Sequence, residues 1–124
     1  MRIVVIGAVA AGLKAAAKAR RGSSDAVITV VDKGEIISYG ACGMPYYVSG
    51  EVKELDELYK TPAGIVRSAA FFKSVKDVNV LTRTMATAID RVSKTVAVRS
   101  LADGTESVLP YDKLVIATGA SPLK

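Results

Sequence analysis

The chain has 124 residues, of which 50% are hydrophobic and 23% are charged, and its formal net charge is +5. This length and mixture are typical of one globular domain with its own core. A positive charge could indicate nucleic-acid binding, but the basic residues are scattered. Only the stretch Lys18-Ala19-Arg20-Arg21 is dense, and few aromatic residues accompany it. The charge therefore favours a local site for a small polyanion over a nucleic-acid surface.

Cysteine and histidine content narrows the class further, since the chain has one cysteine and no histidine. A single cysteine excludes an internal disulfide framework and favours a reducing compartment. Without histidine, no Cys–His or Ser–His couple and no histidine metal site can form within the chain. No apolar run reaches membrane-spanning length, and the apolar run at 3–6 is too short for a signal peptide. We therefore expect a cytoplasmic protein with no metal and no membrane partner.

The first third of the chain has the pattern of a β-α-β unit. Residues 2–6 are a continuous apolar run, as a strand buried on both faces requires. A glycine turn over 7–12 follows, and residues 13–21 are alanine-rich and predicted to be helical. Residues 27–31 are predicted to form a second buried strand, which Asp32 closes. The two strands should be parallel, with a right-handed connection.

Shorter elements are predicted in the middle of the chain. Residues 33–39 are predicted to be a loop, and 42–48 a short helix that ends at a serine and a glycine. Pro62 suits the first position of a helix that runs to about Lys73. Residues 78–81 have the composition of a short buried strand.

The last third changes character. Residues 84–91, 95–100 and 106–110 alternate and carry β-branched side chains, and 102–104 have the composition of a hairpin turn. These segments predict a small antiparallel meander. The apolar run at 114–117 predicts a final buried strand. Together the elements indicate an α/β fold, a parallel sheet with a small antiparallel meander.

The glycine turn resembles a dinucleotide-binding motif, G-x-G-x-x-G between a strand and a helix. Gly7 and Gly12 occupy the first and last glycine positions, Val9 stands at the middle one, and Asp32 follows twenty residues after Gly12. An acidic residue at that place can accept hydrogen bonds from a ribose. The alternative interpretation is an ordinary β-α-β crossover with a glycine-rich turn. The final buried strand, predicted at 114–117, runs into Thr118-Gly119, and this arrangement favours the dinucleotide site.

The cysteine lies in the segment 38–47, where small residues precede it and a short apolar run follows. This pattern predicts a loop that enters a helix with Cys42 near the first turn. Free backbone N–H groups and the positive end of the helix dipole would there favour the thiolate, the form that acts as a nucleophile or redox donor. The alternative is a buried cysteine that behaves as a small hydrophobic residue.

In this order the motifs resemble the N-terminal part of the flavin-dependent pyridine nucleotide–disulfide oxidoreductases. The chain is most similar to the branch with one active-site cysteine, which includes coenzyme A disulfide and persulfide reductases, NADH oxidases and NADH peroxidases. Within that branch, Pro45-Tyr46 after Cys42-Gly43 most resembles the coenzyme A disulfide and persulfide reductases. The resemblance covers essentially the whole chain and rests on four segments: 7–21, Asp32, 38–47 and 117–119.

The resemblance implies a Rossmann-like FAD-binding domain, with residues 1–124 as the N-terminal part of an FAD/NAD(P)-binding domain of a longer, homodimeric protein. Cys42 would be the redox sulfur beside the flavin. Coenzyme A would run along the first helix, near Lys14, Lys18, Arg21 and Ser38. FAD would be lined by the glycine turn, the acidic strand end and the last strand: Gly7, Val9, Ala10, Ala11, Gly12, Asp32, Lys33, Ala117, Thr118 and Gly119.

The implied enzyme is an FAD-dependent NAD(P)H oxidoreductase that acts on a sulfur group. NAD(P)H would reduce FAD, and Cys42 would attack a coenzyme A disulfide or persulfide and form a mixed disulfide. One alternative is an NADH oxidase or peroxidase in which Cys42 cycles through sulfenic acid. An alternative from another class is a non-catalytic nucleotide-binding module. The expected partner is a small-molecule disulfide or persulfide, not a nucleic acid.

Overall fold

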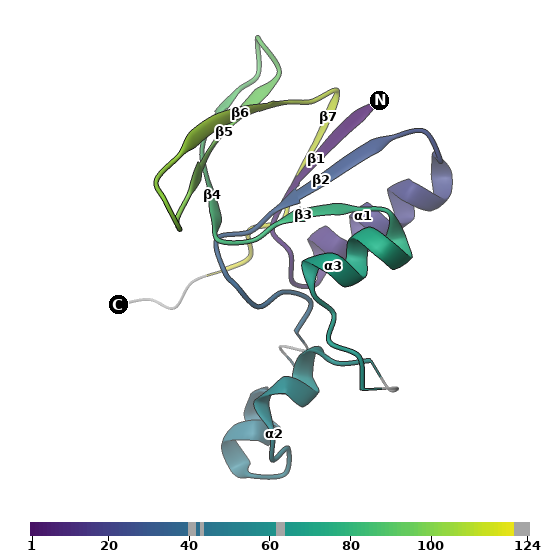
Figure 1. Ribbon diagram of the computed structural model, residues 1–124, viewed down its shortest axis with the longest axis vertical. Coiled ribbons are helices and arrows are strands. Elements are labelled where there is room, and N and C mark those ends of the chain that lie inside the picture. The colour runs from purple at the N-terminus through teal and green to yellow at the C-terminus, as the bar shows by residue number, and fades with distance from the viewer. Residues whose placement is uncertain (40–41, 43, 62–63, 121–124) are drawn as a thin grey trace.

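The computed structural model describes residues 1–39, 42, 44–61 and 64–120. Three layers form the body of the protein: helices, a parallel sheet and an antiparallel sheet (Figure 1). A segment that contains α2 projects away from this body (Figure 1).

The central layer is a four-stranded parallel sheet with the strand order β3-β2-β1-β7. Its strands are β1 (Arg2–Ile6), β2 (Val27–Val31), β3 (Asn79–Leu81) and β7 (Lys113–Ile116). Helix α1 (Ala11–Gly22) connects the first two strands. The β-α-β unit is therefore confirmed, and its helix starts two residues earlier than predicted.

Strand β1 separates two hydrophobic clusters, because its side chains point alternately to the two faces of the sheet. Ile3 and Val5 belong to the cluster on the helical side, which contains Leu13 of α1 and Phe72. Val4, Ile6 and Val31 belong to the second cluster, against the antiparallel sheet, with Val96, Val98 and Tyr111. Burial on both faces explains why this strand is apolar at consecutive positions.

The antiparallel sheet consists of β4 (Thr84–Asp90), β5 (Thr95–Ser100) and β6 (Glu106–Pro110), paired in that order. The meander is therefore confirmed. The hairpin turn between β5 and β6 is also confirmed, since the N–H of Gly104 donates to the carbonyl of Ser100 at 2.8 Å.

Two predicted helix boundaries are wrong. Helix α2 (Met44–Ser49) begins two residues later than predicted, and Cys42, just ahead of it, has a 3-10 conformation, so the cysteine does lie near the start of the helix. A 3-10 helix, η2 (Leu55–Tyr59), was not predicted.

The second wrong boundary concerns the helix predicted from Pro62, which lies outside the described residues. Helix α3 (Ala69–Phe71) begins seven residues later, after Ser68, whose hydroxyl accepts the N–H of Phe71 at 3.2 Å. It continues into a π-helix, η3 (Phe72–Lys76). The chain before it is held in a different conformation by an antiparallel bridge between Lys60 and Val66.

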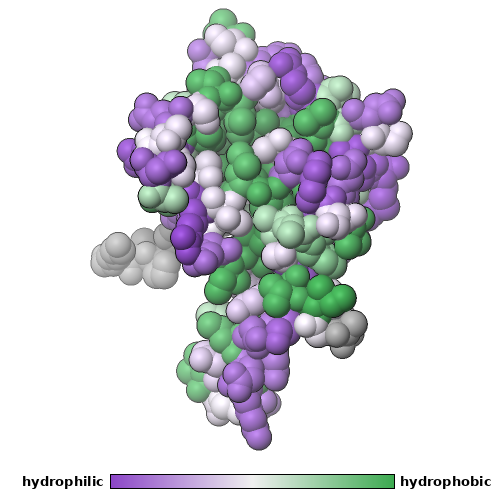
Figure 2. Space-filling model, in the orientation of Figure 1, coloured by the Kyte–Doolittle hydropathy of each residue, from purple (hydrophilic) through white to green (hydrophobic). Residues whose placement is uncertain are grey.

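The projecting segment has little core of its own, since neither α2 nor η2 contains a buried residue. Val48 is 83% exposed and Tyr46 is 53% exposed. Figure 2 shows that hydrophobic surface also runs down the middle of the body, between more hydrophilic flanks. Clusters of exposed apolar side chains are typical of surfaces that other protein elements cover.

Within the dense basic stretch 18–21, Arg20 has a structural role. Its guanidinium donates to the carbonyl oxygens of Ser24 at 2.7 Å, Ala26 at 2.6 Å and Asp77 at 3.0 Å. These bonds tie the end of α1 to the start of β2 and to the end of η3. Arg20 is thus occupied within the protein, whereas Lys18 and Arg21 are exposed.

Gly12 is required by the close packing of α1 on β1. A Cβ at this position would overlap the carbonyl oxygen of Gly7 and lie 3.1 Å from Cγ1 of Val5. Overpacking of this kind costs about 1–3 kcal/mol. We expect Gly12→Ala to lower the free energy of unfolding by at least about 2 kcal/mol, measured by urea denaturation.

Gly22, at the end of the same helix, is a matched control, because a Cβ there would have no heavy atom within 4 Å. Gly22→Ala should raise the free energy of unfolding by about 0.5–1 kcal/mol through helix propensity and chain entropy. Equal effects of the two substitutions would contradict the assignment of Gly12 to a steric contact.

Candidate functional site

A cavity of about 410 Å³ opens at the carboxyl ends of β1 and β2. We call it the strand-end cavity. In open parallel sheets ligands bind at this edge. The described residues that line it are Ile6, Gly7, Val9, Val31, Asp32, Lys33, Tyr39, Thr84, Met85, Ala86, Thr118 and Ala120. Five of the predicted cofactor residues are among them: Gly7, Val9, Asp32, Lys33 and Thr118.

Gly7 has the geometry that the glycine turn requires. Its φ of +115° is in the region that favours glycine, and a Cβ would overlap the carbonyl oxygen of Ala117. The N–H of Ala117 in turn donates to the carbonyl of Ile6 at 2.8 Å. The close approach brings the end of β7 beside the turn, so the two predicted motifs meet at one end of the sheet.

Asp32 is held by the backbone on both sides of the cavity. The N–H of Ala8 donates to its Oδ2 at 2.7 Å, and the N–H of Gly34 donates to its Oδ1 at 2.7 Å. Each carboxylate oxygen keeps a further lone pair for another donor. The carboxylate is therefore fixed in place at the wall of the cavity.

The other five predicted cofactor residues are not among the described residues that line this cavity. Gly12 is buried under Gly7, and Ala117 contacts the turn through its backbone. Ala11 opens α1, Ala10 faces a different cavity, and Gly119 is exposed.

Sequence reasoning missed the wall that the meander contributes, formed by Thr84, Met85 and Ala86. These residues reach the cavity because the N–H of Thr84 donates to the carbonyl of Asp32 at 2.9 Å. No motif marks them, since the contact joins the loop after β2 to the start of β4. In the structure, Arg83 directly before them has a φ of +47°, which marks a tight change of direction.

An ion pair supports the same junction. A nitrogen of the Arg83 guanidinium lies 2.6 Å from Oε2 of Glu35, and the N–H of Arg83 donates to the carbonyl of Gly34 at 2.9 Å. The side-chain hydrogen bond from Arg83, followed by its charge, lowers the pKa of Glu35. Both side chains are more than half exposed, so the pair orients the loop more than it stabilises the fold.

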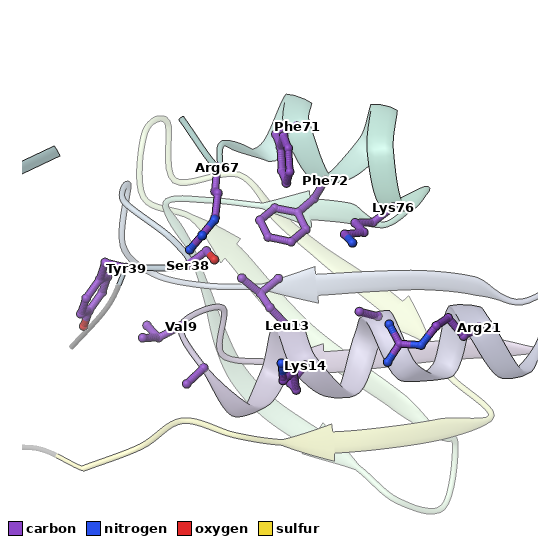
Figure 3. A pocket seen from close by; sticks show the side chains of 12 residues that line it. Val9, Leu13, Lys14, Arg21, Ser38, Tyr39, Arg67, Phe71, Phe72 and Lys76 are labelled. Carbon is purple, nitrogen blue, oxygen red and sulfur yellow. The ribbon is translucent and has the colours of Figure 1, made fainter. Parts of the chain in front are cut away.

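A second cavity, of about 470 Å³, runs along α1 and is seen from close by in Figure 3. We call it the α1 groove. It brings together three of the four predicted coenzyme A residues: Lys14, Arg21 and Ser38. Lys18 is exposed and is not among the described residues that line it. Its lining consists of Val9, Ala10, Leu13, Lys14, Ala17, Arg21, Ser38, Tyr39, Arg67, Phe71, Phe72 and Lys76.

Two cations of this groove, Arg67 and Lys76, were missed by sequence reasoning. They come from the segment around α3 and η3, more than forty residues along the chain from α1. The described lining contains four cationic side chains and no acidic one. Such a groove is complementary to a polyanion, as the overall charge predicted.

The two cavities are neighbours, since Val9 and Tyr39 line both. Val9 stands where the standard motif has its middle glycine, so its side chain takes part in the shared wall. The strand-end cavity and the α1 groove therefore form one continuous region around the glycine turn.

Cys42 is a free, exposed cysteine that follows Tyr39, a lining residue of both cavities, by three positions. Ser38 lies four residues before it, which limits the separation of their Cα atoms to roughly 14 Å. Its neighbours Gly40, Ala41 and Gly43 lie outside the described residues. The exposure excludes the interpretation of Cys42 as a buried hydrophobic residue of this structure.

The described residues contain no group of three or more Cys, Asp or Glu side chains placed to hold a metal ion. None of the helices described here has the length and apolar character needed to cross a membrane.

Because Asp32 accepts two backbone hydrogen bonds, its removal should lower the stability of the fold. Asp32→Ala leaves the N–H groups of Ala8 and Gly34 without their acceptor, and hydrogen bonds to a charged group contribute about 1.5–3 kcal/mol. We expect the urea midpoint to fall accordingly. Asp25 is an exposed aspartate at the other end of β2, and Asp25→Ala should leave the midpoint nearly unchanged. An unchanged midpoint in Asp32→Ala would mean that the carboxylate does not hold the turn.

Comparison with known proteins tests the resemblance. All residues, 1–124, match the family model described as pyridine nucleotide-disulphide oxidoreductase. A protein named NADH oxidase from Methanocaldococcus jannaschii is 36% identical over 123 residues, which are 98% of this chain and 26% of that protein. A coenzyme A disulfide reductase from Staphylococcus haemolyticus is 32% identical over 119 residues, which are 96% of this chain and 26% of that protein.

The solved structure of an NAD-dependent persulfide reductase from A. fulgidus superimposes with a TM-score of 0.96 and 55% identity, over 100% of this chain and 23% of that one. The α/β fold class is therefore confirmed. The chain spans about a quarter of the length of these relatives. Because the family model matches the whole chain, the protein belongs to the pyridine nucleotide-disulphide oxidoreductase family.

Proposed function

We propose that this chain is the N-terminal FAD-binding part of an NAD(P)H-dependent oxidoreductase that reduces a coenzyme A persulfide or disulfide through Cys42. The observation that carries the proposal is the contact between two cavities of different character. One has the features of a dinucleotide site, the other is a cationic groove, and the exposed thiol lies within a short reach of both.

The strand-end cavity suits the adenosine and pyrophosphate of FAD. The glycine turn lines this cavity through Gly7, and the free lone pairs of Asp32 can accept ribose hydroxyls. Thr118 and Lys33 add a hydroxyl and a cation to the same wall. FAD, when bound, supplies the transfer of two electrons from the nicotinamide to a sulfur acceptor.

The α1 groove suits the nucleotide end of coenzyme A. Lys14 and Arg21 on α1 and Lys76 across the groove can neutralise phosphates, and Phe72 offers apolar surface between them. Lys18 is outside the lining, but it lies on α1 between Lys14 and Arg21 and would add to the positive electrostatic potential of the groove. Ser38, at the other end, would contact the pantetheine arm.

Cys42 would supply the covalent chemistry. Its thiolate attacks one sulfur of the disulfide, a new S–S bond forms to Cys42, and the other sulfur leaves as a thiolate. Two electrons then cleave the mixed disulfide and return Cys42 to the thiolate. Attack along the S–S axis needs access to the thiol, which its exposure provides.

A second candidate is favoured by the names of relatives. Several similar proteins are called NADH oxidase, among them that of Methanocaldococcus jannaschii. In such an enzyme Cys42 would be oxidised by peroxide to sulfenic acid and reduced again by two electrons.

The proposal also includes a cytoplasmic location and a homodimeric full-length protein. Further segments of that protein would complete the flavin and nicotinamide sites.

The mass of a trapped Cys42 species tests the proposal. The full-length protein, reduced with NADH and then exposed to coenzyme A disulfide, should carry one coenzyme A on the peptide that contains Cys42, because attack forms the mixed disulfide. Intact-protein and peptide mass spectrometry measure the adduct. Cys42→Ser is the control and should carry none.

Other outcomes identify the alternatives. A gain of one oxygen after peroxide treatment, without a coenzyme A adduct, would favour the oxidase or peroxidase reaction. An unmodified thiol under both conditions would favour a non-catalytic nucleotide-binding module.

A further inference from the structure

The α1 groove carries positive charge at both ends, and its middle is lined by apolar side chains and by Lys14. In Figure 3, Arg21 and Lys76 lie at one end, Arg67 lies at the other, and Leu13 and Phe72 lie between. Helix α1 runs from Ala11 to Arg21 along this groove, which at 1.5 Å per residue is about 15 Å. One compact phosphate group cannot occupy both charged ends, so the far ends recognise different parts of a ligand.

Arg67 is the cation at the end of the groove that Ser38 and Tyr39 also line, and these two residues come four and three positions before Cys42. Its side chain is partly buried and lies beside Ser38 in Figure 3. Its backbone N–H donates to the carbonyl of Tyr59 at 2.9 Å, which fixes the position of the chain. Among the described residues its guanidinium has no hydrogen-bond or ion-pair partner, so its charge is available to a ligand.

Ser38 makes this end rigid. It has a φ of +54°, in the left-handed region that is costly for a residue other than glycine, and its N–H donates to the carbonyl of Ala8 at 2.8 Å. Cys42 follows within roughly 14 Å. Arg67 therefore lies at the end of the groove from which the chain leads to Cys42, and under the proposed function the reacting sulfur of a ligand would arrive there.

We propose that Arg67 is a specificity-determining residue that binds the anionic terminal sulfur of a persulfide. The inference rests on the proposed function and goes beyond it, because it distinguishes the two candidate substrates. A persulfide is a stronger acid than a thiol and carries its negative charge on the terminal sulfur, whereas a disulfide is neutral at both sulfurs. A permanently charged guanidinium at the sulfur end favours the former.

The positive charge of Arg67 would also affect the rate of the reaction. The Cys42 thiolate and the persulfide are both anions and repel each other as they approach. The Cys42 sulfur bonds to the carbon-bound sulfur, the S–S bond of the persulfide breaks, and the terminal sulfur takes one proton from solvent and leaves as hydrosulfide. FAD, when bound, would supply two electrons from NADH, and with them the mixed disulfide would separate into two thiolates. Arg67 offsets the repulsion in the first step.

The test compares two substrates in the full-length protein with bound flavin. We expect Arg67→Gln to lower kcat/KM for coenzyme A persulfide by about 10- to 100-fold, the range for losing a hydrogen bond to a charged group. For coenzyme A disulfide the loss should stay below about threefold, since no anionic sulfur is bound. Arg67→Lys keeps the charge and should recover most of the persulfide activity.

Two matched controls separate this role from general effects of charge. Lys76→Gln, at the opposite end of the groove, should lower kcat/KM for both substrates by the same factor, because both carry the same nucleotide. Lys73, which is exposed, bonds to Asp77 at 3.4 Å and does not line the groove, so Lys73→Gln should change neither. If Arg67→Gln fails to fold, Arg67→Met, which keeps the apolar stem, replaces it.

The outcomes are distinct. Equal losses for both substrates in Arg67→Gln, or no loss for either, would overturn the role of Arg67 while the proposed function stands. A wild-type protein that reduces neither substrate would overturn the proposed function itself, and the inference with it.

Discussion

The absence of side chains at Gly7 and Gly12 is the constraint on which the rest of the structure depends. At this point α1 rests on the turn through Gly12, and the end of β7 rests on it through Ala117. Three segments thus meet at distances that a single Cβ would prevent. The turn that these contacts fix also lines the strand-end cavity through Gly7. The close packing of the fold and the shape of this cavity therefore have one steric origin.

A second consequence of this arrangement is that both cavities meet at one edge of the sheet. The two hydrophobic clusters on either face of β1 orient α1 on one side and the meander on the other. The helical side thereby forms the α1 groove, and the meander side forms the wall of the strand-end cavity. Val9 and Tyr39 lie at the boundary of both. A ligand in either cavity is thus close to the loop that carries Cys42.

Positive charge has two distinct uses in this chain. Arg20 bonds to four backbone carbonyls and secures the end of α1, whereas Arg21, its neighbour, lines the groove. Their adjacent positions on a helix point them in different directions, because successive residues are rotated by about 100°. Composition shows that the chain is basic, but only the direction of each side chain separates a structural cation from one that lines a cavity.

The sequence by itself determined the β-α-β unit, the meander and the family, because these depend on local periodicity and on glycines at fixed spacing. It also determined Asp32, Lys14, Arg21 and Ser38 as residues that line a cavity. The starts of α2 and α3 and the contributions of Arg67, Lys76 and Thr84 were decided only by the tertiary structure. Each of these depends on contacts between segments far apart in the chain, such as the bridge from Lys60 to Val66 and the bond from Thr84 to Asp32. Such contacts leave no periodic trace in the sequence, since their energy comes from the packing of the whole fold.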